Sequence, residues 1–129
     1  MDLNDKQKGM MKDSDRKSFG REGMTGDEAK KRFQKGEEKK LQALISNYLN
    51  LHGIWFTWQR TDKRATSRVG TPDFLCVKPG GTFLAVEAKA SGGTLSREQA
   101  VALSEIRNLG GIAIVAYTLQ DVIDALNAS

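Results

Sequence analysis

Cysteine and histidine are nearly absent from this chain of 129 residues, which contains one of each. A single cysteine, Cys76, excludes an internal disulfide and a zinc site built on cysteines, and its apolar surroundings predict a buried thiol. The only histidine, His52, stands directly before Gly53 at the expected end of a helix. We interpret it as a helix-terminus residue and not as a catalyst, so chemistry based on a thiol or an imidazole is disfavoured.

Long apolar runs are missing as well. No segment approaches the roughly 20 apolar residues that span a bilayer, and the first residues lack the hydrophobic core of a signal peptide. We therefore expect no membrane partner and a cytoplasmic protein. Basic residues exceed acidic ones by 20 to 16, which gives a net charge of +4. This surplus is modest, but it suits a polyanionic partner because Lys and Arg neutralise phosphates.

The first 36 residues differ from the rest in composition. They are rich in charge and poor in apolar residues, so they cannot bury enough surface to offset the entropy of ordering. We predict a basic, largely mobile tail over 1–36 and a folded domain over 37–129. Within the tail, residues 25–28 have the form of a helix capping box. They predict a short helix through Phe33 that Gly36 would interrupt.

Apolar periodicity after residue 36 divides the chain into helices and strands. The expected elements, in order, are a helix over 37–52, strands over 54–59, 73–77 and 82–89, a helix over 97–109, a strand over 112–117 and a final helix around 122–126. A strand reached through a crossover helix lies parallel to its neighbour. The sequence therefore predicts an α/β fold of order α-β-β-β-α-β-α, with a mixed central sheet flanked by helices.

The hairpin over 73–89 holds the residues that suggest chemistry. Asp73 begins its first strand, and Glu87 and Lys89 end its second strand among apolar neighbours. Charges are costly inside a sheet unless they are paired or bound to a metal ion. Side chains alternate along a strand, so Glu87 and Lys89 share one face while Ala88 lies on the other.

The register of this hairpin decides whether the two carboxylates meet. If Pro79-Gly80-Gly81 form a three-residue loop, Lys78 pairs with Thr82 and Asp73 lies opposite Glu87, with Cβ atoms about 5 Å apart. A two-residue loop would shift the register by one and turn Asp73 to the wrong face. We predict the three-residue loop.

Two carboxylates at that separation repel each other unless a cation lies between them. An oxygen-only site completed by water and phosphate suits Mg²⁺, with Mn²⁺ able to substitute. Lys89 on the same face would orient a metal-activated water or offset negative charge. The plainer interpretation is that Asp73 caps a turn and that Glu87 and Lys89 form a surface pair. The coincidence of all three on one face favours a catalytic site.

Pro72-Asp73 and Glu87-Ala88-Lys89 resemble the signature of the PD-(D/E)XK nuclease superfamily. More closely, residues 38–126 resemble the VRR-NUC (viral-type replication-repair nuclease) family, particularly its small stand-alone members from phages and bacteria. The blocks that carry this resemblance are Glu38-x-x-Leu41-Gln42, Gly70-Thr71-Pro72-Asp73-Phe74, Glu87-Ala88-Lys89, Leu95-Ser96-x-x-Gln99 and Gly110-Gly111-Ile112-Ala113. The resemblance implies a restriction-endonuclease-like core and a divalent-metal phosphodiesterase.

The resemblance also implies roles for individual residues. The metal would be bound by Asp73, Glu87 and the backbone carbonyl of Ala88, and Lys89 would be catalytic. It further assigns supporting catalytic roles to Glu38 and Gln99. Glu37 is an alternative to Glu38, and the plain interpretation of either is a carboxylate favoured by the helix dipole at an N-terminus. For Gln99, a capping box with Ser96 is a sufficient structural explanation.

Stand-alone members of the family resemble Holliday-junction resolvases, which act as dimers on branched DNA. An isologous homodimer supplies two active sites for paired cuts. We therefore expect a Mg²⁺-dependent DNA endonuclease that acts on Holliday-junction or flap structures in replication, recombination or repair. The cell would be bacterial and the gene bacterial or phage-encoded. Alternatives are a restriction-type or nicking endonuclease, a noncatalytic DNA-binding module with the same fold, and an RNA-processing nuclease.

A polar, basic loop leads to Asp73 and is the predicted DNA contact. Its basic residues are not spaced as on a helix, and neighbouring hydroxyl groups add donors for phosphates. The alternative is a solvated loop without a ligand. The predicted DNA-binding residues are Arg60, Lys63, Arg64 and Arg68.

Overall fold

The computed structural model of the chain describes residues 25–59 and 68–128. The chain divides into two units, Met1–Phe33 and Gln34–Ser129, and the sheet belongs to the second unit. The mobility predicted for residues 1–24 lies outside the described residues. The predicted boundary between a tail over 1–36 and a domain over 37–129 stays a prediction.

The first described helix is longer than the sequence predicted. Helix α2 (Gly26–Leu51) runs without a break through Gly36. The capping box at its start is confirmed, since the backbone N–H of Glu28 donates to Thr25 Oγ1 over 3.0 Å and that of Thr25 donates to Glu28 Oε1 over 2.8 Å. The predicted interruption at Gly36 is wrong. One glycine costs a helix only about 1 kcal/mol relative to alanine, and strong helix formers flank it here.

The sheet has the predicted mixed topology. Strands β1 (Trp55–Trp58), β2 (Phe74–Val77), β3 (Phe83–Ala88) and β4 (Ile112–Ala116) lie in the order β1-β2-β3-β4. The first three are antiparallel, and β4 lies parallel to β3. Helix α3 (Arg97–Asn108) forms the crossover between β3 and β4, and α4 (Leu119–Asn127) ends the chain. The predicted α/β order of α-β-β-β-α-β-α is confirmed.

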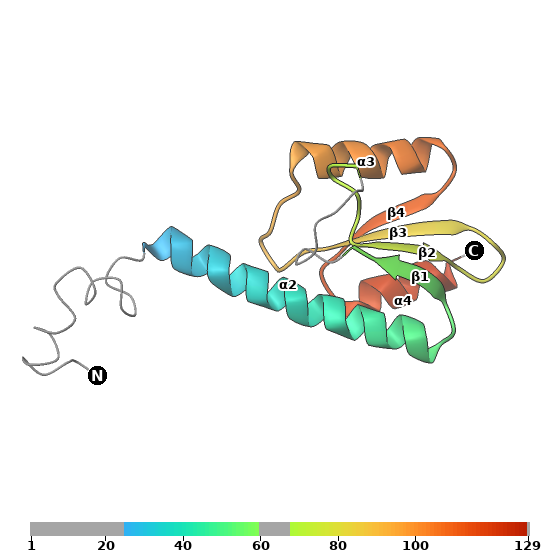
Figure 1. Ribbon diagram of the computed structural model, residues 1–129, viewed down its shortest axis with the longest axis horizontal. Helices are drawn as coiled ribbons and strands as arrows, with labels where there is room; N and C mark the ends of the chain where they lie inside the picture. Colours follow the sequence, from blue (N-terminus) through green and yellow to red (C-terminus); the bar gives the residue numbers. More distant parts are fainter. Residues whose placement is uncertain (1–24, 60–67, 129) are drawn as a thin grey trace, which may run out of the picture. The chain divides into compact units, whose positions relative to one another are not determined.

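Helices cover both faces of the sheet (Figure 1), with α3 on one side and α4 and the body of α2 on the other. Alternation along β3 divides the core accordingly. Leu84 and Val86 pack in the larger cluster with Ile45 of α2, whereas Ala85 packs with Leu103 of α3. Every second residue of β3, including Glu87, therefore faces the α3 side.

The two residues that were set aside in the sequence behave as expected. Cys76 is fully buried, and burial raises the pKa of its thiol to about 11, which keeps it protonated and unreactive. His52 follows the last residue of α2, and its ring packs on Tyr48 with centroids 4.1 Å apart. Among the described helices, none combines the length and the apolar character needed to cross a bilayer.

The hairpin turn confirms the predicted register. The backbone N–H of Lys78 donates to the carbonyl of Thr82 over 2.9 Å, which encloses a loop of three residues. Gly80 and Gly81 adopt φ values of +98° and +95°, which only glycine reaches without strain. The Lys78 side chain is buried and donates to the carbonyls of Ala125 and Ala128 at the end of α4.

Candidate active site

Asp73 and Glu87 lie opposite each other at the end of the hairpin that is remote from its turn. The pairing of Phe74 with Val86 carries the register on to Asp73 and Glu87, as predicted. Both side chains are buried, with exposed fractions of 8% and 3%. Two ionisable carboxyl groups therefore share one water-poor position at the start of β2.

Asp73 is fixed from several sides. Its Oδ2 accepts from the backbone N–H of Ala88 over 2.9 Å, and its carbonyl accepts from the N–H of Gln59 over 2.7 Å. Burial raises the pKa of the Asp73 carboxyl, while the hydrogen bonds from Ala88 and from the side chain of Gln42 work in the opposite direction. The hydrogen bonds thus hold the carboxylate in one orientation, while burial leaves its pKa above the ordinary value.

Only one of the two carboxylate oxygens of Glu87 has a side-chain partner. Its Oε2 accepts from the amide of Gln99 over 3.0 Å and lies 3.9 Å from Lys89 Nζ. Its Oε1 is buried and has no hydrogen-bond partner within the described residues. Burial, followed by the charge of Asp73, raises the pKa of Glu87 to about 8, against the opposing effects of the Lys89 charge and of a hydrogen bond from the backbone N–H of Asp73. A buried oxygen without a partner destabilises the fold, and a ligand bound at Oε1 would remove that cost.

Gln99 caps α3, as its spacing from Ser96 predicted, and it also contacts the acidic pair. Its Oε1 accepts from the backbone N–H of Ser96 over 2.9 Å, and its own backbone N–H donates to Ser96 Oγ over 3.1 Å, which completes a capping box. Because the cap uses the amide oxygen, the amide nitrogen points to Glu87. Helix capping and contact with the acidic pair are two functions of one side chain.

The structure also separates the two candidate glutamates of α2. Glu38 is half-buried, its Oε2 lies 3.5 Å from the backbone nitrogen of Ala90, and its charge raises the pKa of both Asp73 and Glu87. Glu37 instead forms a surface ion pair with Lys40 over 3.2 Å. Glu38 is therefore the helix carboxylate that lies near the acidic pair.

Gln42 is a contact that the sequence analysis did not assign. It lies one helical turn after Glu38 on α2, and its side chain hydrogen-bonds Asp73. The signal available in the sequence was its spacing of four residues from Glu38, which places both on one face of the helix. Each carboxylate of the pair consequently has a glutamine partner, Gln42 for Asp73 and Gln99 for Glu87.

The acidic pair fits a hard divalent cation. No cluster of three His, Cys, Asp or Glu side chains in the described part of the chain has a metal-binding arrangement. Two carboxylates are nevertheless sufficient for Mg²⁺, which keeps several water ligands and takes others from substrate phosphates. The unpartnered Glu87 Oε1 and the raised pKa of both groups are features that a bound cation would relieve.

The predicted DNA-contact loop is described only at its end. Arg60, Lys63 and Arg64 lie outside the described residues. Arg68 forms an ion pair with Glu105 of α3 over 3.0 Å, and both side chains are well exposed. Such a pair contributes only ~0–1 kcal/mol to stability, so Arg68 can exchange its partner at little cost.

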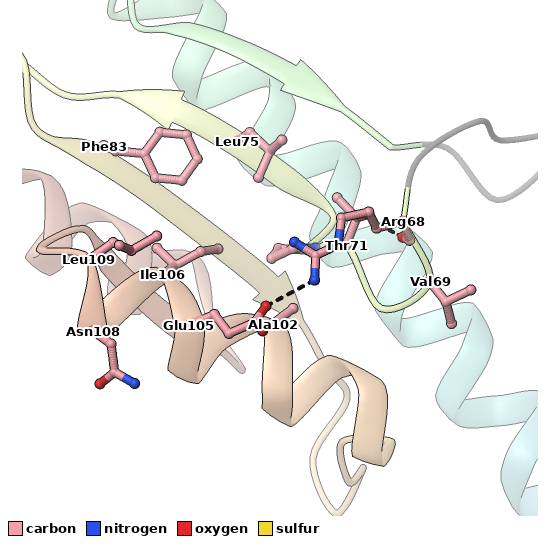
Figure 2. A pocket seen from close by; sticks show the side chains of 11 residues that line it. Arg68, Val69, Thr71, Leu75, Phe83, Ala102, Glu105, Ile106, Asn108 and Leu109 are labelled. Atoms are coloured by element: carbon pink, nitrogen blue, oxygen red, sulfur yellow. Dashed lines mark hydrogen bonds and ion pairs between the residues drawn. The ribbon is translucent and has the colours of Figure 1, made fainter.

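An apolar groove of about 700 Å³ lies on the α3 side of the sheet (Figure 2). Phe83 and Leu75 of the hairpin face Ile106 and Leu109 across it, and the Arg68–Glu105 pair closes one end. Neither carboxylate of the acidic pair lines this groove. The acidic pair is therefore separate from this groove.

Comparison with known proteins fits this geometry. The family model described as the VRR-NUC domain matches residues 14–119, which is most of the chain. The chain belongs to the VRR-NUC family. The resemblance found in the sequence is thus confirmed, and the VRR-NUC family is a nuclease family of the PD-(D/E)XK type, whose members generally use divalent metal ions.

A solved structure described as a VRR_NUC domain supports the fold of this VRR-NUC protein. It superposes with a TM-score of 0.55 at 20% sequence identity, over 70% of this chain and 94% of the other. A search of the curated proteins found no match. At this identity the structural match speaks for the restriction-endonuclease-like architecture alone, and the assignment of individual residues depends on the geometry of the acidic pair.

Proposed function

We propose that this VRR-NUC protein is a Mg²⁺-dependent endonuclease that hydrolyses phosphodiester bonds of branched DNA, of the Holliday-junction or flap type. The observation that carries the proposal is the opposed, buried pair of Asp73 and Glu87, with one Glu87 oxygen unpartnered and an ammonium group alongside. A binding module has no use for buried charges that destabilise the fold. A metal-dependent hydrolase needs them.

Asp73, Glu87 and the backbone carbonyl of Ala88 would hold the metal ion in this proposal. Bound Mg²⁺, or Mn²⁺ in its place, supplies Lewis acidity toward the phosphate and lowers the pKa of a coordinated water. The chain's own contribution is orientation. The N–H of Ala88 fixes Oδ2 of Asp73, and Gln99 fixes Oε2 of Glu87, so Oε1 of Glu87 stays available.

Lys89 would act on the reacting groups directly. Its ammonium lies 3.9 Å from Glu87 Oε2, and its side chain is 12% exposed. A partly desolvated cation at this place stabilises negative charge that develops on the phosphate, or orients the attacking water. Glu38 lies close enough to influence both carboxylates, so we place it in a supporting catalytic role together with Gln99.

DNA would be held by the basic segment that leads to Asp73. Arg60, Lys63, Arg64 and Arg68 are proposed to contact phosphates, with Arg68 leaving its exposed pair with Glu105 to do so. A homodimer would present two active sites to a symmetric junction and allow paired cuts. In this proposal the protein would act in replication, recombination or repair of DNA in the cytoplasm of a bacterial cell, as a bacterial or phage-encoded enzyme.

One assay tests the proposal. Purified protein is given labelled linear, flap, replication-fork and four-way-junction DNA with Mg²⁺, Mn²⁺ or EDTA, beside the variants Asp73→Ala and Lys89→Ala. Paired, metal-dependent cuts in the four-way junction, lost in both variants, are the expected result. Elution volume against mass standards measures the oligomeric state.

The same assay identifies the alternatives. Cutting of linear duplex at defined sequences would replace the branched-DNA proposal with a restriction-type or nicking enzyme. Binding without metal-dependent cutting would leave a noncatalytic module. A parallel set of RNA substrates cut in preference to DNA would point to RNA processing.

A further inference from the structure

Gly70 lies in contact with the backbone of α3. A Cβ atom at this position would lie 2.5 Å from both the backbone carbon and the carbonyl oxygen of Glu98. Real Cβ atoms essentially never approach other atoms so closely, and neither partner is a flexible side chain that can rotate away. The space beside Gly70 is therefore closed to every side chain.

The local backbone gives an independent reason for glycine. The N–H of Thr71 donates to the carbonyl of Arg68 over 3.1 Å, which closes a four-residue turn with Gly70 in its third position. Gly70 has a φ of +86°, as a type II turn requires at that place. The turn directs the chain past the start of α3 and, three residues later, into Asp73.

Other glycines show that the two features are separable. Gly80, Gly81 and Gly110 have φ values of +98°, +95° and +98°, yet a Cβ at any of them would meet nothing within 4 Å. Strain from a positive φ is common to all four positions. The close approach to another element is particular to Gly70 within this set.

The contact between Gly70 and Glu98 connects the turn that leads to Asp73 with the helix whose Gln99 holds Glu87. On one side, Gly70 precedes Asp73 in the turn that enters β2. On the other side, Glu98 precedes Gln99, whose amide holds Glu87 over 3.0 Å. Any outward movement of the first turn of α3 changes the position of the Gln99 amide relative to Glu87.

We infer that Gly70 is a positioning residue of the nuclease site, acting through α3. Its missing side chain lets the start of α3 approach the turn before Asp73, so that Gln99 reaches Glu87. The inference rests on the proposed metal-dependent function for its catalytic consequence. The effect of residue 70 on the contact between Gln99 and Glu87 does not depend on the proposed function.

The test compares Gly70→Ala with Gly81→Ala in the full chain. Both substitutions impose the strain of a positive φ, and only the first overlaps α3. The first readout needs neither metal nor DNA: the side-chain amide resonance of Gln99 in an NMR spectrum, assigned by its disappearance in Gln99→Ala. It shifts in Gly70→Ala and stays unchanged in Gly81→Ala.

The second readout is Mn²⁺ binding measured by calorimetry without DNA. Gly70→Ala weakens binding by about tenfold, as expected for loss of a contact that orients a metal ligand, and Gly81→Ala does not. Combining Gly70→Ala with Gln99→Ala weakens binding little beyond Gln99→Ala alone, because both act through one contact. In the cutting assay, the metal concentration for half-maximal rate rises while the KM for DNA is unchanged.

Should Gly70→Ala fail to fold, Gly70→Asn takes its place. Asparagine adopts positive φ more readily and keeps the same Cβ overlap. An unshifted Gln99 resonance together with wild-type Mn²⁺ affinity in the folded variant overturns the inference. A wild-type protein that binds no metal and cuts no DNA overturns the proposed function instead, and the resonance still decides the role of Gly70.

Discussion

Gln99 donates its side-chain amide to Glu87 over 3.0 Å while the oxygen of the same amide caps the helix that carries it. A helix N-terminus is thereby built into the acidic site. The amide cannot turn over without losing the hydrogen bond from the backbone of Ser96. The capping box thus sets which end of the Gln99 side chain faces the carboxylate.

Gln99→Ala is expected to impair both stability and cutting. Loss of the cap destabilises the protein by about 1 kcal/mol, and loss of the contact with Glu87 lowers cutting roughly 10- to 100-fold. Ser96→Ala is the matched control, because it removes a similar part of the cap and leaves the Gln99 side chain in place. Thermal unfolding and single-turnover cutting measure the two effects. An equal loss of cutting in both variants would mean that only the cap matters.

Metal binding is expected to stabilise the folded protein. A ligand present at about 100 times its Kd stabilises by ~2.7 kcal/mol. For a domain of this size, that raises the Tm by roughly 10 °C. Differential scanning calorimetry with Mg²⁺ or Mn²⁺ against EDTA measures the shift, with Asp73→Ala as the control. A shift of the same size in Asp73→Ala would place the metal elsewhere.

The metal-free protein is expected to lose stability as the pH rises. The pKa of Glu87 is raised in the folded state from its ordinary 4.5 to about 8, so the folded protein holds this proton more tightly than the unfolded chain. The resulting stabilisation is complete below about pH 4.5 and is lost as the pH rises through about 8. Denaturant unfolding in EDTA at pH 5 to 8.5 measures the slope.

Glu87→Gln is the matched variant for that experiment. A neutral amide removes the buried charge, so at pH 8 without metal the variant is expected to be more stable than the wild type, on the order of 3 kcal/mol. The same variant loses the stabilisation by Mg²⁺. A wild type whose stability is flat across this pH range would contradict the raised pKa of Glu87.

Lys89→Ala is expected to separate cutting from metal binding. Its ammonium stabilises the reacting groups, so its removal lowers the rate by about 100-fold or more. Affinity for Mn²⁺ is retained or increased, because a positive charge near the acidic pair has been removed. Calorimetry and single-turnover cutting on one preparation test this. Parallel loss of both properties, as expected for Asp73→Ala, would make Lys89 a residue of structural importance only.

Arg68 and Glu105 offer a pair of opposite substitutions at the DNA surface. Arg68→Ala is expected to weaken DNA binding and to reduce the dependence of log affinity on log salt by about one unit. Glu105→Ala frees the guanidinium and is expected to tighten binding a few-fold at low salt. Fluorescence anisotropy over a range of salt concentrations, with EDTA to prevent cutting, measures both. The same change in both variants would show that Arg68 does not contact phosphate.

Much of the acidic site was predictable because its geometry is local. Three turn residues at 79–81 set the register of the hairpin, and the register then brought Asp73 opposite Glu87. Alternation placed Lys89 on the same face. The order of helices and strands followed from apolar periodicity for the same reason, because the spacing of apolar residues within a segment indicates its type of secondary structure.

Contacts between segments were not predictable in the same way. Helical spacing left Glu37 and Glu38 as alternatives, because one continuous helix through residue 36 was not expected and the face of a helix depends on what it packs against. Gln42 gave no chemical signal, since a carboxamide becomes significant only beside a carboxylate. The approach of Gly70 to Glu98 depends on where α3 lies in space, which no pattern within residues 68–72 expresses.

The buried ammonium of Lys78, held by the carbonyls of Ala125 and Ala128, joins the hairpin to α4. It makes the end of α4 a structural partner of the hairpin that carries both acids. Any change that displaces the end of α4 would therefore remove the hydrogen-bond acceptors of this buried ammonium and disturb the hairpin.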